Sequence, residues 1–204
     1  MADLSRLALD PRLLVSGLRL IDPKLFKPEP LPAGTTSAEV TFAAKDLPGL
    51  VRNAALAICG FADDAVANRA PSVLWRNGAS ELLLLPGGVQ TQLGDGIVAL
   101  SVPVRCDQSG DVLVHLSFFV GAPGRPAGLV AATEPRPRGP AAVVDVWGER
   151  LVAFGWRIVV ELATHIAAES GRDEDGAPLL PVAITATANG LTVLPMARHA
   201  MDRK

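Results

Sequence analysis

The segment GIVALSVPVRCDQSGDVLVHLSFFVG (residues 96–121) predicts a β-hairpin, and the rest of the expected architecture is built around it. Apolar and polar side chains alternate on both sides of Gln108-Ser109-Gly110, as in two half-buried antiparallel strands joined by a three-residue loop. The predicted register pairs Val104 with Val114 and Leu100 with Phe118 on an apolar face. The opposite face is mixed and pairs Ser101 with Ser117, Pro103 with His115, and Arg105 with Leu113. The apolar face needs a hydrophobic partner, whereas the mixed face is compatible with water or with a cover.

Further hairpins extend the expected sheet. The dipeptides Asn77-Gly78 and Asn189-Gly190 favour tight turns, because both residue types accept positive φ. In the last hairpin, a two-residue loop places Ala186 opposite Val193. The strands expected besides the central hairpin are 38–43, 72–76, 81–85, 128–133, 182–188 and 191–194.

A long helix is expected from Pro140 to about Gly171, and a shorter one over residues 47–58 with Asp46 as its cap. At 100° per residue, one broad apolar face of the long helix holds Trp147, Leu151, Phe154, Ile158, Leu162 and Ile166. A second side carries the small or branched residues Gly148, Val152, Gly155 and Val159. One sheet covers one face of a helix, so we expect a second partner, from the N-terminal arm or from a neighbouring subunit.

Residues 1–34 are expected to form an arm, and residues 35–204 a single domain. Prolines at short intervals prevent one long element, although Asp10-Pro11 is typical of the start of a short helix running to about Leu20. The arm is rich in apolar side chains and should dock on something. The predicted fold class is therefore α+β: an antiparallel, hairpin-built sheet packed on a long C-terminal α-helix, with a proline-rich N-terminal arm.

Composition narrows the classes of function. Charged residues interrupt the longest apolar stretch, 143–160, so no membrane span is expected, and the N-terminus lacks the pattern of a signal peptide. Cys59 and Cys106 are far apart and have no nearby Cys or His partner, which favours reduced thiols in a cytoplasmic protein. A net charge of −2 with 4% aromatic residues argues against nucleic-acid binding. The abundance of Ala, Gly, Pro, Arg and Val is typical of a GC-rich bacterial genome.

No motif carries a recognisable chemistry. The glycines of segment 121–128 lack the GK[ST] of a phosphate loop and precede an expected strand, so they are interpreted as turns. Arg136 and Arg138 precede the long helix and could flank an anion at its N-terminus, although loop arginines are more often solvated. His165 lies one turn from Glu161, a spacing shared by metal sites and surface ion pairs, but there is no HExxH. We therefore expect no metal, no cofactor and no catalytic residue.

Two functional hypotheses remain. The first is a non-catalytic structural or interaction protein: a self-associating or partner-binding subunit of a bacterial multiprotein assembly. Its expected contact residues are Leu14, Leu18, Phe26, Gly148, Val152, Gly155 and Trp156. The alternative is a small-ligand-binding protein or enzyme with a pocket between sheet and helix. Its expected ligand-binding residues are Arg105, His115, Ser117 and Arg136.

Overall fold

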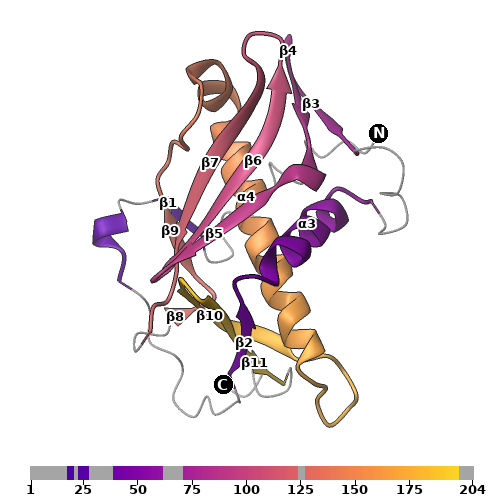
Figure 1. The fold of residues 1–204 in the computed structure, drawn as a ribbon, viewed down its shortest axis with the longest axis vertical. Helices are drawn as coiled ribbons and strands as arrows, with labels where there is room; N and C mark the ends of the chain where they lie inside the picture. The colour runs from indigo at the N-terminus through magenta and orange to yellow at the C-terminus, as the bar shows by residue number, and fades with distance from the viewer. Residues whose placement is uncertain (1–17, 21–22, 28–38, 62–70, 124–126, 198–204) are drawn as a thin grey trace.

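A computed structural model describes residues 18–20, 23–27, 39–61, 71–123 and 127–197, and it has the predicted α+β class. The antiparallel strands form two curled sheets instead of one, and the long C-terminal helix packs against both (Figure 1). The helices among the described residues are α3 (Leu47–Ile58) and α4 (Ala141–Glu169), with short 3-10 turns η1 (Pro23–Leu25) and η3 (Pro86–Gly88).

The larger sheet has the strand order β1-β9-β7-β6-β4-β3. β5 also pairs with β6, so β4 and β5 lie along the same edge of that strand. Its strands are β1 (Leu18–Leu20), β3 (Val73–Asn77), β4 (Ser80–Leu84), β5 (Gln90–Gly94), β6 (Ile97–Cys106), β7 (Gly110–Phe119) and β9 (Ala131–Thr133). We call this the large sheet. Its inner face packs on α4, which crosses behind β5, β6 and β7 in Figure 1, and its opposite face is called the outer face.

The smaller sheet has the order β2-β11-β10-β8 and joins segments from the two ends of the domain. Its strands are β2 (Val40–Ala43), β8 (Ala127–Gly128), β10 (Leu180–Thr187) and β11 (Gly190–Met196). The strand expected over 128–133 is divided between the sheets, since β8 pairs with β10 and β9 pairs with β7. Leu129 and Val130 connect them and are half-buried.

The core lies between the two sheets, α3 and α4. All six residues of the predicted apolar face of α4 are buried. The residues of its predicted second side are buried too: Gly148, Val152, Gly155 and Val159. At Gly155 the helix lies close against the large sheet: a methyl group there would overlap Leu116 Cδ1 and lie 3.0 Å from Phe118 Cζ. The sides of α4 that the large sheet leaves open are therefore covered by the smaller sheet and by α3, which belong to the same chain.

The central hairpin keeps its predicted faces but not its predicted register. Cys106 pairs with Gly110, so Val104 faces Val112 and Ser101 faces His115. The turn begins one residue earlier than expected, with the Ser109 amide donating to the Cys106 carbonyl at 3.3 Å. Every pair is displaced by two residues, an even number, and each side chain therefore stays on its predicted face.

Of the predicted arm, the structure describes Leu18–Leu20 and Pro23–Lys27. Leu18–Leu20 form β1, which pairs in parallel with β9, so the helix expected to run to about Leu20 is not present at its C-terminal end. Pairing with the sheet edge outweighs the local helical signal there. Leu14 and the rest of the predicted arm lie outside the described residues.

In the described part of the chain, α4 is the helix long and apolar enough to cross a membrane by length and composition. In its most apolar 18-residue stretch, 67% of the residues are buried inside the protein. The apolar surface of α4 is thus used by the core.

Candidate functional site

The outer face of the large sheet brings together the polar side chains of the central hairpin. Ser101 on β6 lies directly opposite His115 on β7, and its Oγ is 2.9 Å from His115 Nδ1. Gln90 on β5 is the partner of Ser101 on the other side. Directly opposed residues of antiparallel strands share a face, so these three side chains form a row across β5, β6 and β7.

Arg138 extends this row beyond β7. It forms an antiparallel bridge with His115, in which the His115 amide donates to the Arg138 carbonyl at 2.8 Å and the reverse bond measures 3.0 Å. The side chains of His115 and Arg138 are exposed, whereas the neighbouring Val114 is buried on the inner face. We call Gln90, Ser101, His115 and Arg138 the polar row.

Arg105 lies on the same face but is already neutralised. It pairs directly with Asp111 across the hairpin and donates two hydrogen bonds to its carboxylate, of 2.5 and 2.9 Å. The hydrogen bond from Arg105 lowers the pKa of Asp111, and the same bond raises the pKa of Arg105. This pair was not predicted from the sequence, because the predicted register places Arg105 opposite Leu113.

Arg136 is also held by a carboxylate. Its guanidinium lies 2.7 Å from Asp145 in the second turn of α4, and both side chains are exposed. The predicted ligand-binding residues are therefore divided: His115 and Ser117 lie on the outer face, whereas Arg105 and Arg136 are in ion pairs. None of the four lines a space between sheet and helix, because the inner face is filled by buried apolar side chains.

The predicted contact residues of α4 are inside the protein. Val152 and Trp156 are each 1% exposed, and the Trp156 ring lies 5.8 Å from that of Phe118 on β7. Gly148 is also buried, and a methyl group there would lie 3.1 Å from Pro137 Cδ. Together with Gly155, these residues serve contacts within the chain. Of the contact residues expected in the arm, Leu18 lies in β1 and Phe26 is half-buried.

Beside the polar row, the outer face carries an apolar band that was not predicted from the sequence. It is formed by side chains from four neighbouring strands and the residue after β4: Leu74, Leu83, Leu85, Pro103 and Leu113. Leu113 is 42% exposed and the others are half-buried. We call this set the outer band. The corrected register reveals it, because it aligns Leu113 with Pro103 on the adjacent strand.

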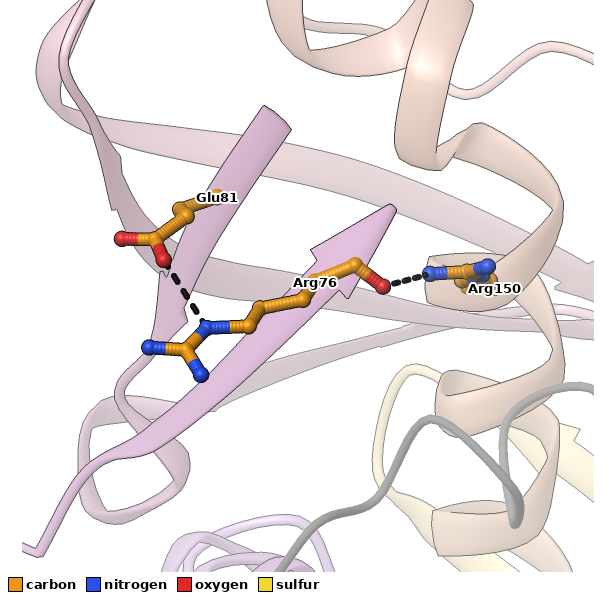
Figure 2. A network of polar contacts seen from close by, with 3 residues as sticks. All are labelled: Arg76, Glu81 and Arg150. Atoms are coloured by element: carbon orange, nitrogen blue, oxygen red, sulfur yellow. Dashed lines mark hydrogen bonds and ion pairs between the residues drawn. The ribbon is translucent and has the colours of Figure 1, made fainter. Parts of the chain in front are cut away.

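Charged side chains occupy the β3 edge of the large sheet (Figure 2). Arg150 of α4 donates a 3.2 Å hydrogen bond to the Arg76 carbonyl at the end of β3, and its guanidinium lies 5.0 Å from the centre of the Trp147 ring. The Arg76 side chain in turn donates to Glu81 on β4 at 2.8 Å. Charges at a sheet edge disfavour pairing with a further strand.

A shallow groove of about 160 Å³ lies between α3 and α4. Glu161 and His165 line it from α4 and Asn53 from α3, with apolar neighbours. Glu161 also lies 3.8 Å from Arg157. No cluster of three or more His, Cys, Asp and Glu side chains suited to a metal ion occurs among the described residues. Of the two thiols, Cys59 is fully buried, and burial raises its pKa to about 12.

These observations define an α+β protein in which two antiparallel sheets enclose a long helix and whose outer sheet face carries a polar row beside an apolar band. No protein-family model, curated protein or solved structure matches the chain.

Proposed function

We propose that this protein is a non-catalytic interaction subunit that associates with a second copy of itself through the outer face of the large sheet. The supporting observation is the outer band, whose apolar side chains lie on the sheet face turned away from α4, with Leu113 42% exposed. The proposal includes a cytoplasmic location within a bacterial assembly, and neither nucleic acid nor membrane as partner.

The size of this face is comparable to one side of a standard interface. At about 3.3 Å per residue and about 4.8 Å between strands, the seven strands of the large sheet give an area on the order of 650 Å². Standard protein interfaces bury about 800 Å² on each partner.

The charges on this face are compatible with a two-fold arrangement. The Arg105–Asp111 and Arg76–Glu81 pairs each present a cation and an anion beside the outer band. In an interface between identical copies, the same patch meets itself, so each sign must find its complement within that patch. Both pairs are exposed and can realign toward a second copy without breaking a buried contact.

The test is the absolute mass of the full chain by light scattering after gel filtration. We expect twice the chain mass of 21.3 kDa. Leu113→Arg places a charge in the outer band and should raise the dissociation constant of the dimer about ten-fold to a hundred-fold. This factor corresponds to the free energy of burying one leucine side chain. Val146→Arg is the matched control, since Val146 is 39% exposed but lies on α4, and it should leave the mass unchanged.

A monomeric wild-type chain would overturn self-association. A dimer that survives Leu113→Arg at concentrations near the wild-type dissociation constant would place the interface elsewhere. Point substitutions are preferred to truncation at Thr35, because truncation removes β1 from the edge of the large sheet.

A further inference from the structure

The polar row places different hydrogen-bonding groups at neighbouring positions of one sheet face. An amide, a hydroxyl, an imidazole and a guanidinium follow one another across the pairs Gln90–Ser101, Ser101–His115 and His115–Arg138. Opposed side chains in such pairs are about 5 Å apart at their Cβ atoms, so the row spans about 15 Å. All four residues are exposed or half-buried and accessible from solvent.

Two groups of the polar row already bond to each other, whereas the Arg138 guanidinium makes no ion pair among the described residues. Ser101 Oγ occupies Nδ1 of His115, which leaves Nε2 for another partner. When Ser101 donates to Nδ1, the ring proton resides on Nε2 and the imidazole becomes a donor on its solvent side. The Arg138 guanidinium makes no ion pair within the described residues, whereas the nearby Arg136 is paired with Asp145.

From this arrangement we propose that the polar row binds an oxyanion group, a phosphate or carboxylate, between His115 and Arg138. Arginine is well suited to such groups because its planar fork donates two parallel hydrogen bonds. The Ser101 contact orients the imidazole, and Arg138 provides the charge. The carboxylates of Asp111 and Asp145 are already held by Arg105 and Arg136, and so do not compete for Arg138.

The imidazole signals of His115 in the full chain report this binding directly. They are assigned by their loss in His115→Gln and followed by NMR during titration with inorganic phosphate, with acetate, and with sodium chloride of matched ionic strength. We expect a saturable change with phosphate or acetate at millimolar concentration and no comparable change with chloride. The stronger of the two responses identifies the ligand as a phosphate or a carboxylate.

Two variants locate the charge. Arg138→Gln should weaken the response at least ten-fold, whereas Arg136→Gln, only two residues away but paired with Asp145, should leave it unchanged. A response that persists in Arg138→Gln would overturn the proposal. Because the polar row lies on the face that the proposed dimer would bury, the titration is repeated on a Leu113→Gln chain whose monomeric state is checked by light scattering. A response there with none in the wild-type chain indicates blockage by a second copy, whereas no response in either chain overturns the oxyanion proposal.

Discussion

Replacement of Gly155 by alanine tests whether α4 is covered by its own chain. The added methyl group would overlap Leu116 Cδ1 and lie 3.0 Å from Phe118 Cζ, and both side chains are buried beneath the helix. Introducing a methyl into a close-packed core costs about 1–3 kcal/mol. Alanine in a helix interior recovers about 1 kcal/mol relative to glycine. Because the methyl would overlap a neighbouring side chain, the cost falls in the upper half of this range, and we therefore expect a net loss of about 1–2 kcal/mol in the free energy of unfolding.

For a chain of this length, that loss corresponds to a decrease in Tm of about 2–8 °C. Differential scanning calorimetry of the full chain measures it, and Gly49→Ala is the control. Gly49 lies in the first turn of α3 with nothing within 4 Å of an added methyl, so this change should leave Tm unchanged or slightly raised. A Gly155→Ala protein with wild-type Tm but a smaller mass in light scattering would refute the reasoning, because Gly155 would then contact a second chain.

Three further results are expected. A maleimide at pH 7 should label Cys106 in the native protein and Cys59 only after denaturation, since burial raises the pKa of the Cys59 thiol to about 12; native labelling of both, read by mass spectrometry, would contradict the packing of α3. Because the pKa of Asp111 is lowered in the folded protein, its ion pair stabilises the fold above about pH 4, the ordinary pKa of the free carboxyl. This contribution is lost as the pH falls through the lower pKa that Asp111 has in the folded protein. Asp111→Asn should therefore lower Tm more at pH 7 than at pH 2, and an equal effect at both would contradict the assignment. Trp75 is fully buried and its Nε1 has no hydrogen-bond partner among the described residues, so Trp75→Phe removes no hydrogen bond and its cost, on the order of 2 kcal/mol in urea denaturation, comes from the cavity that it leaves. No measurable loss would show that the ring is not packed in the core.

The α+β class and the main helices were predictable because they depend on local periodicity. The apolar face of α4 repeats at helical spacing over its whole length, and every residue of that face is buried as expected. The shorter helix also begins and ends where predicted, with Gly60 at φ 75° after its last turn, although Asp46 makes no side-chain cap. These signals are contained in neighbouring residues and do not require knowledge of what packs against them.

Strand registers were not predictable, because in this chain they depend on contacts with distant segments. Asn189-Gly190 resembles a two-residue turn, yet Ala188 and Asn189 occupy the turn and Gly190 pairs with Thr187. A methyl group on Gly190 would overlap the carbonyl oxygen of Phe42 in β2. The glycine is required by the close approach of a strand about 150 residues earlier, which no local pattern reveals.

The neighbours within the candidate site were not predictable either, because they depend on the strand register. His115 and Ser101 were both identified as polar residues of the mixed face, but the predicted register separated them and placed Arg105 away from Asp111. Arg138 was considered only as a residue before the helix, because its bridge to His115 joins a loop to a strand. The face was predictable from alternation, whereas the neighbours on that face were not.

The covering of α4 also changes where a partner must be sought. A helix that is apolar on most sides suggests an exposed interface, but two sheets and α3 already bury those sides. Among the described residues, the large apolar side chains that remain exposed are Leu25 in η1, Val146 on α4 and Leu113 in the outer band, which adjoins the polar row. Arg150 and the Arg76–Glu81 pair occupy the β3 edge, which disfavours strand addition there. The proposed association through the face of the sheet would bury the outer band and leave the hydrogen bond from Arg150 to the Arg76 carbonyl intact.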